Sequence, residues 1–568
     1  MRQKDQDKAI LYFLAIFALA LFLRIVRLGV LPLSEPEAVY AWQALTIARG
    51  EPVGVSNQLG YTGLTALSFF LGQASNFWAR WWPAMAGSLL VFLPYIWRKQ
   101  LGTLLALTLS AGLALDTGLV ALSRQAGSPI IGLLGLLMGL SYLIKGRRSL
   151  AGVFLALGLL GGPSFWLGLL VLGLTWLVAR LLKLDLPPGL SGFSVQDVTT
   201  QNSFLTMLSA FGITLLVLGT SFSLYPAGLG ALMSGLVDFT ARFTQAPTLP
   251  VWQPFWMLLT NQFLPLIFAI WAGISAWVNH KRIGRLLSIW ALVALGLVFA
   301  MPGRHTADLA WAIIPIWALA IPKILSCFRV DPENRNLQVI IILFALILII
   351  FTSMNLNALA DPALMQQNLL RYLLAAGAGI ILLLITLILI GLGWDVGLAK
   401  YSGLMALVIS LSVITLALSF ANLGPHATRS QKIWGQGSFM PLSDMLSGTM
   451  QTIASQAGVP AEDAGVLVID SPQASLAWVL RDFGEVRFAA MMPEDNPSDF
   501  VITKAQDLPQ LAAAYRGEAF SWQEKPTWQA MTIDVLLRWA VRREPAIEKT
   551  TLILWSRVDF FIGSQKTN

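Results

Sequence analysis

Two acids near the start of the chain are the first groups that could do chemistry. Glu35 and Glu37 lie in residues 33–41, directly after a long apolar stretch, and Pro36 fixes a turn at the start of a predicted helix. One interpretation is a capped surface helix, because negative charge is favoured at a helix start. The functional interpretation is that a carboxylate here activates an acceptor or holds a divalent cation.

A second group of ionisable residues lies in residues 115–125. Asp116 and Arg124 are about two helical turns apart. They could therefore face one cavity, or they could form a structural ion pair with each other.

A third group lies in residues 302–311 and contains Arg304, His305 and Asp308. Arginine suits phosphate binding, because its planar guanidinium offers a fork of donors. His305 could assist Arg304 or could simply lie at the level of the lipid headgroups.

The composition places all of these groups in a membrane protein. Of the 568 residues, 56% are hydrophobic and only 12% are charged, and the mean hydropathy is +0.68. This excludes a soluble, disordered or fibrous chain. No run of Lys and Arg with interleaved aromatics indicates nucleic-acid binding. The single cysteine, Cys327, excludes an intrachain disulfide, a cysteine-based zinc site and an iron–sulfur cluster.

The apolar stretches predict a polytopic helical bundle with about thirteen spans, since a bilayer core needs about 20 apolar residues per helix. The expected spans are residues 9–30, 80–97, 101–114, 128–145, 149–162, 164–182, 204–222, 255–278, 286–301, 308–326, 337–354, 369–393 and 402–421. With a cytoplasmic N-terminus, the Lys- and Arg-rich connections all fall in the cytoplasm, as the positive-inside bias requires. An odd number of spans then places the C-terminal tail outside.

Two domains are predicted: a transmembrane domain at 1–421 with outer loops 31–79 and 223–254, and an extracytoplasmic domain at 422–568. The first loop contains expected surface helices at 34–50 and 61–73, and the second an amphipathic core at 227–243. The tail predicts a small α/β domain. Its expected strands are 465–470, 485–491, 500–504 and 551–555, its expected helices are 471–483, 508–515 and 531–543, and its linker is 424–437.

The order of these features resembles the GT-C superfamily of membrane glycosyltransferases, in the branch of protein O-mannosyltransferases and aminoarabinose transferases. The resemblance covers roughly residues 9–325 and rests on residues 34–41, the Ser123-Arg124 loop after Asp116, and Pro302-Gly303-Arg304 ahead of 308–311. The Asp-Glu pair of the family reads Pro36-Glu37 here, with Glu35 one place earlier.

The resemblance implies inverting transfer of a sugar from a polyprenyl-phosphate donor to an extracytoplasmic lipid, glycan or protein acceptor. Glu37, or Glu35, would activate the acceptor hydroxyl, and Arg304, Arg124 and His305 would bind the donor phosphate. The cavity would also contain Asp116, Asp308, Tyr40 and Tyr61. Mg²⁺ or Mn²⁺ is the expected cofactor, with Glu37 and Asp116 as ligands. The expected setting is a bacterial cell membrane, with membrane lipids as further partners.

Two other classes of function fit the same sequence. A flippase or transporter of lipid-linked sugars would also have many helices, but it would need acids or broken helices near the midplane. A non-catalytic relative that assists assembly of envelope glycans would explain the altered acidic pair.

Overall fold

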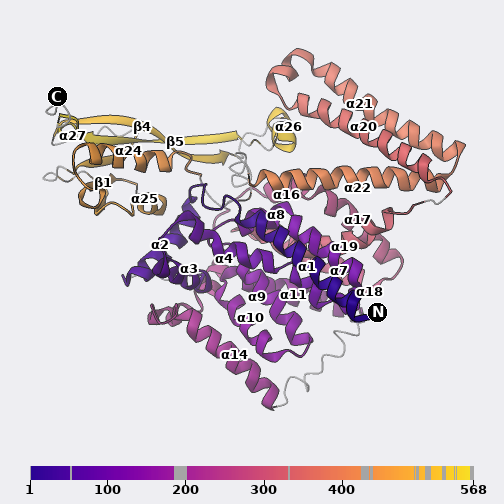
Figure 1. Cartoon of the computed structure of the whole chain (residues 1–568), viewed down its shortest axis with the longest axis horizontal. Helices are drawn as coiled ribbons and strands as arrows, with labels where there is room; N and C mark the ends of the chain where they lie inside the picture. The colour runs from indigo at the N-terminus through magenta and orange to yellow at the C-terminus, as the bar shows by residue number, and fades with distance from the viewer. Residues whose placement is uncertain are drawn as a thin grey trace.

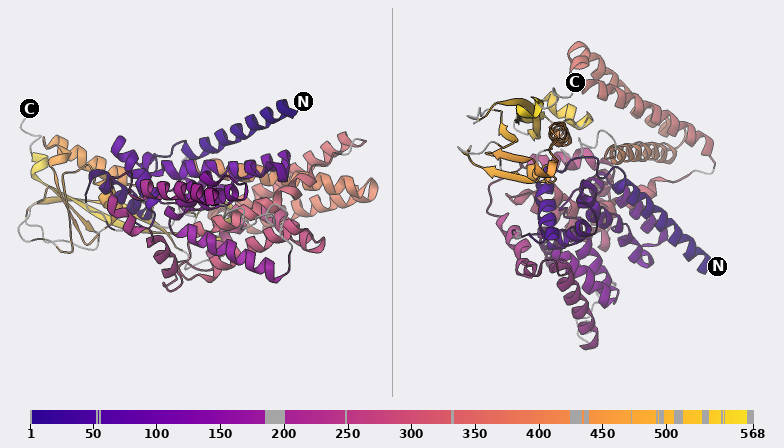
Figure 2. Two further views of the ribbon diagram at one scale, coloured as in Figure 1. Left: turned by 90° about the horizontal axis from the view of Figure 1, so that it is seen from below. Right: turned by 60° about the vertical axis from the view of Figure 1, so that its left-hand side comes forward.

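The computed structural model describes residues 2–562 except for 52, 53, 55, 185–200, 248, 331–332, 424–433, 435–438, 472, 492, 494–497, 506–512, 528–532, 543 and 545. A helical body makes up most of the molecule, and a small sheet lies at one end of it (Figure 1). The N-terminus lies at the opposite end from the sheet (Figure 2). The predicted fold class, a mainly helical membrane bundle with a small C-terminal α/β part, is confirmed.

Seven described helical segments are long and apolar enough to cross a membrane, or up to nine if each of two bent pairs is one span. They lie in α1 (Arg2–Ile25), α11 (Pro163–Leu181), α18 (Arg282–Ala300), η2 (Thr306–Leu309) with α19 (Ala310–Cys327), α20 (Arg335–Leu359), α21 (Pro362–Gly393) and α22 (Val396–Ala421). In the first bent pair, the chain turns by 56° between α7 (Thr103–Leu115) and α8 (Thr117–Ser123). In the second, it turns by 98° between α16 (Trp252–Asn261) and α17 (Phe263–Val278).

The other four predicted spans differ from single long helices. Residues 80–97 are divided between α4 (Asn76–Leu89) and α5 (Phe92–Ile96), and α6 (Arg98–Leu101) follows. Three more lie in α9 (Ile130–Ile144), α10 (Arg148–Leu160) and α14 (Gln201–Gly219), which contain shorter apolar helical segments of 10–17 residues. A side chain at Gly135 would collide with the backbone of Gly158, so α9 and α10 pack closely. In the described chain, nine of the thirteen predicted places are therefore candidate spans when each bent pair is taken as one, and the other four contain shorter helical segments.

The two predicted outer loops contain helices where the sequence places them. The first loop holds α2 (Glu35–Arg49) and α3 (Leu59–Leu71), and the second holds η1 (Pro226–Ala231) and α15 (Ser234–Ala241). Lys145 belongs to one predicted cytoplasmic connection, and Trp97 directly precedes a second one. The Nζ atom of Lys145 lies 4.3 Å from the ring centre of Trp97. Two predicted cytoplasmic connections therefore lie close together.

The tail contains a five-stranded sheet in the order β2-β1-β3-β5-β4. Its strands are β1 (Gly465–Ile469), β2 (Glu485–Ala489), β3 (Phe500–Lys504), β4 (Tyr515–Thr527) and β5 (Ala546–Arg557). β1 runs parallel to β2 and β3, whereas β5 runs antiparallel to β3 and β4. The helical segments of this part are α24 (Ser443–Gln456), η3 (Ala461–Asp463), α25 (Ala474–Val479), α26 (Ile533–Arg542) and α27 (Asp559–Ile562).

Two predictions for the tail fall largely outside the described residues. Of the expected helix at 508–515, residues 508–512 are not described, and Tyr515 begins β4 instead. Of the expected linker at 424–437, Trp434 alone is described, and it is buried. Its carbonyl accepts a hydrogen bond of 3.2 Å from Thr306 Oγ1.

Candidate functional site

The start of α2 is held by a closed set of contacts around Glu37. Arg80 of α4 donates to both carboxylate oxygens, at 2.7 Å from Nε and 2.9 Å from Nη2. The backbone N–H and hydroxyl of Ser34 donate to Oε2, each at 2.9 Å, and the backbone N–H of Ala126 donates to Oε1 at 3.0 Å. Glu37 therefore caps its own helix and ties it to two other segments.

The ionisation of Glu37 follows from these contacts. Burial alone would raise the pKa of this carboxyl, but the charge and hydrogen bonds of Arg80 outweigh burial and hold the pKa below its usual value. Glu37 is 4% exposed and does not line the pocket described below. A carboxylate with a lowered pKa and with both oxygens hydrogen-bonded to the protein is a poor proton acceptor.

Glu35 faces the tail rather than a cavity. Its two carboxylate oxygens accept hydrogen bonds from the backbone N–H groups of Ala474, at 2.8 Å, and Ser475, at 3.1 Å, at the start of α25. Trp478 of α25 also donates to Asn76 Oδ1 at 2.8 Å. Glu35 thus joins the C-terminal sheet region to α2.

Asp116 and Arg124 do not pair with each other. Asp116 lies at the break between α7 and α8, where it accepts hydrogen bonds from Leu119 N at 2.7 Å and Trp317 Nε1 at 2.8 Å. Arg124 instead donates to backbone carbonyls at the C-terminal end of α1, including Leu23 at 3.1 Å and Val26 at 2.9 Å. Both residues hold helix ends in place.

Arg304 also binds backbone carbonyls. Its Nε donates to Met301 at 2.9 Å and its Nη1 to Leu249 at 2.7 Å, which fixes the chain that follows α18. Asp308 accepts a hydrogen bond from the backbone N–H of His305 at 3.0 Å. Burial and the nearby Arg242 lower the pKa of His305, so its imidazole is neutral at pH 7.

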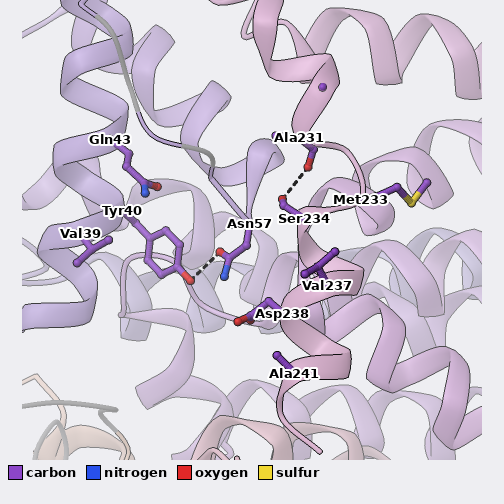
Figure 3. Close-up of a pocket in the computed structure, with 11 residues that line it drawn as sticks. Val39, Tyr40, Gln43, Asn57, Ala231, Met233, Ser234, Val237, Asp238 and Ala241 are labelled. Atoms are coloured by element: carbon purple, nitrogen blue, oxygen red, sulfur yellow. Dashed lines mark hydrogen bonds between the residues drawn. The ribbon is translucent and has the colours of Figure 1, made fainter. Parts of the chain in front are cut away.

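A pocket of about 620 Å³ opens between α2 and α15. The residues that line it come from both predicted outer loops (Figure 3). They are Val39, Tyr40, Gln43, Asn57, Gly230, Ala231, Met233, Ser234, Val237, Asp238 and Ala241. Tyr40 donates to Asn57 Oδ1 at 2.9 Å across this space. Burial, and then the charge of Asp238, raise the pKa of Tyr40, so its hydroxyl keeps its proton.

Of the nine residues predicted for the site, Tyr40 alone lines this pocket. Tyr61 is buried, with its ring centre 6.0 Å from that of Tyr40, and its hydroxyl donates to the carbonyl of Ala79 at 2.7 Å. Asp308 is connected to the pocket through Arg242, whose Nη1 lies 3.3 Å from Asp308 Oδ1.

Sequence reasoning missed Asp238 and Arg242 as site residues. Arg242 Nη2 lies 3.5 Å from Asp238 Oδ2, so one arginine joins the pocket to Asp308. The spacing of four residues between Asp238 and Arg242, within the amphipathic core of the second loop, is the signal that could have identified them.

The expected metal ligands do not fit a divalent cation. Both oxygens of Glu37 and both oxygens of Asp116 already accept hydrogen bonds from protein donors. Among the described residues there is also no group of three or more His, Cys, Asp or Glu side chains placed to hold a metal ion.

Comparison of the sequence with protein-family models and with curated proteins finds no match. The structure is similar to ArnT from Cupriavidus metallidurans bound to undecaprenyl phosphate, with a TM-score of 0.52 and 15% sequence identity over 88% of this chain and 93% of ArnT. The apo state of the same ArnT gives a TM-score of 0.48 and 16% identity over 86% and 87% of the two chains. The predicted resemblance to GT-C glycosyltransferases is thus confirmed at the level of the fold.

Proposed function

We propose that this protein is an integral-membrane glycosyltransferase that moves a sugar from a polyprenyl-phosphate donor to a hydroxylic acceptor outside the cytoplasm. The observation that carries this proposal is the fold, which follows that of undecaprenyl-phosphate-bound ArnT over 88% of the chain. A lipid-linked donor keeps its isoprenoid chain in the bilayer and its phosphosugar at the surface. Such a donor therefore needs a site beside membrane helices.

The pocket between α2 and α15 supports the same function. It is formed by the two segments that the positive-inside bias places on the outer face. Its polar groups include a phenol, two amides, a hydroxyl and a carboxylate, from Tyr40, Gln43, Asn57, Ser234 and Asp238. Groups of this kind bind the hydroxyls of a sugar or of an acceptor.

The reaction that suits this site is a direct displacement. The acceptor oxygen attacks the anomeric carbon as the bond to the phosphate oxygen breaks, which inverts the configuration at that carbon and releases polyprenyl phosphate. The acceptor is a lipid, a glycan or a protein, and the site lies at the outer surface of a bacterial cell membrane with the N-terminus in the cytoplasm.

A transfer assay tests the proposal. Purified protein in lipid nanodiscs is incubated with radiolabelled polyprenyl-phosphate sugars and with a membrane extract that supplies acceptors. Release of polyprenyl phosphate together with a labelled product is the expected result. Movement of the labelled donor across a liposome bilayer without release would indicate a flippase and would refute the proposal.

A non-catalytic relative that assists assembly of envelope glycans is the second candidate. The observation that favours it is the closed network of Glu37, the carboxylate in the position of the altered acidic pair, since Arg80, Ser34 and Ala126 occupy both of its oxygens. This candidate predicts that the purified protein binds the donor but releases no polyprenyl phosphate with any acceptor fraction.

A further inference from the structure

We infer that Asp238 is the carboxylate that takes the proton from the acceptor hydroxyl, within the pocket between α2 and α15. This inference rests on the proposed glycosyltransferase function and adds a catalytic residue to it. It also gives Glu37 a different role, since Glu37 then positions α2 and does not touch the acceptor.

The carboxylates that the sequence predicts for the site already have structural partners. Glu35 holds α25, Asp116 holds Trp317, and Asp308 holds the backbone of His305. The side chain of Asp238 accepts no hydrogen bond from the described residues. Its carboxylate forms an ion pair with Arg242, with 3.5 Å between Oδ2 and Nη2. It is 34% exposed, which leaves one side open to a ligand.

The position of Asp238 in the pocket also favours this role. Among the described residues that line the pocket, Asp238 is the only one with a carboxylate. Its carboxylate points toward the side of the pocket where Tyr40 and Asn57 lie (Figure 3). Gln43, which also lines the pocket, has a buried side-chain oxygen without a hydrogen-bond partner among the described residues. An acceptor with several hydroxyls would supply the missing donor to Gln43 while presenting one hydroxyl to Asp238.

The charge around Arg242 also favours Asp238. This guanidinium lies between Asp238 and Asp308, at 3.5 Å and 3.3 Å, and it is largely buried. Two carboxylates share one positive charge, so the group of three carries one net negative charge when both acids are ionised. Asp308 is 3% exposed and accepts a hydrogen bond from the backbone. The negative charge that a ligand can reach is therefore that of Asp238.

The proposed step combines displacement at the anomeric carbon with transfer of one proton to Asp238. The acceptor oxygen forms a bond to the anomeric carbon, and its proton passes to a carboxylate oxygen of Asp238. The bond between the anomeric carbon and the phosphate oxygen breaks, and its electron pair stays on the leaving polyprenyl phosphate. Asp238 returns its proton to water after the products leave.

The test replaces Asp238 with Asn, which keeps the shape of the side chain but removes the proton acceptor. We expect the Asp238→Asn variant to release polyprenyl phosphate about 10²–10⁴-fold more slowly than the wild type, the range for loss of a general base. Donor binding and the thermal unfolding midpoint should not change. The control is Asp482→Asn, since Asp482 is also paired with an arginine, at 3.7 Å, but is 59% exposed and far along the chain in the tail.

The possible outcomes distinguish failure of the inference about Asp238 from failure of the proposed glycosyltransferase function. A wild-type rate for Asp238→Asn overturns the inference and leaves the proposed function intact. A slow rate that comes with weaker donor binding or a lower unfolding midpoint assigns Asp238 a structural role and also overturns the inference. If the wild-type protein itself releases no polyprenyl phosphate, the proposed function fails, and the inference fails with it. Partial recovery of the rate in Asp238→Glu would support a proton acceptor at this position.

Discussion

At the scale of single residues, the Glu37–Arg80 pair decides how the start of α2 is held. The sequence predicts a catalytic carboxylate at Glu37, whereas its contacts in the structure suit a structural carboxylate. The two interpretations predict different behaviour for one substitution.

We expect Glu37→Gln to destabilise the protein, because it leaves the buried guanidinium of Arg80 without its counter-charge. Removal of one partner from a buried pair typically costs about 3–5 kcal/mol. The measurement is the thermal unfolding midpoint of the purified variant, with exposed Glu51→Gln as the control. An unchanged midpoint together with lost transfer would instead support the catalytic role predicted from the sequence.

Gly127 gives a second residue-scale prediction, because it packs directly against Tyr40. Its φ is +64°, and a side chain at this position would collide with the Tyr40 ring. Gly127→Ala should therefore displace Tyr40 from the pocket and weaken ligand binding, in addition to the backbone strain of about 1–3 kcal/mol.

The matched control for this prediction is Gly146→Ala. Gly146 has a φ of +73°, but nothing lies within 4 Å of a side chain built there. Both variants carry the same kind of backbone strain, so only Gly127→Ala should impair ligand binding in a titration with the polyprenyl-phosphate donor. Equal loss in both variants would contradict the role of the contact with Tyr40.

At the scale of elements, Glu35 connects α2 to α25. Loss of a carboxylate cap costs about 0.5–2 kcal/mol. We therefore expect Glu35→Ala to increase hydrogen exchange at the amides of Ala474 and Ser475 by up to about 30-fold. Glu51→Ala, at the other end of α2, should leave exchange at these amides unchanged. No change in Glu35→Ala would show that α25 is held without this contact.

Elements with a strong local pattern could be predicted from the sequence. The strands β1 and β3 consist mainly of buried apolar residues, and both were expected within one residue of their ends. The strand β4 was missed because most of the residues from Tyr515 to Thr527 are partly or fully exposed and polar. The bend at Gln262 was missed because this residue lies inside the apolar stretch 255–278, which is long enough for one span. The helix after Asp116 was missed because these residues were assigned to the connection between the predicted spans 101–114 and 128–145.

The site was harder to predict than the elements for a physical reason. Hydropathy shows which charged residues lie near a membrane surface, but it does not show which of them already have partners. The carboxylate of Glu37 pairs with Arg80, which is 43 residues away in the sequence. The carboxylate of Asp308 pairs with Arg242, which is 66 residues away. Only the folded chain shows that Asp238 is left facing a pocket.

At the scale of the whole molecule, the two ends of the helical body differ. The C-terminal sheet lies toward one end and the N-terminus toward the other (Figure 2), and Glu35 of α2 contacts the C-terminal part at Ala474. With the proposed cytoplasmic N-terminus, the sheet is expected outside the cytoplasm.

This orientation predicts how introduced cysteines will react. The native Cys327 is buried, and Cys327→Ser gives a background without cysteine. In that background, Asp444→Cys, on α24, should react with a membrane-impermeant maleimide in intact spheroplasts. Lys99→Cys, in a predicted cytoplasmic connection, should react only after the membrane is broken. The reverse pattern would contradict the orientation.

The central claim is that the pocket between α2 and α15 is where the lipid-linked sugar and its acceptor meet. The most direct measurement is an experimental structure of the protein with a polyprenyl-phosphate sugar bound. This account predicts the sugar in the pocket, with its reacting end open to Asp238 and its isoprenoid chain along the membrane helices. A sugar bound elsewhere on the protein, with the pocket left empty, would contradict it.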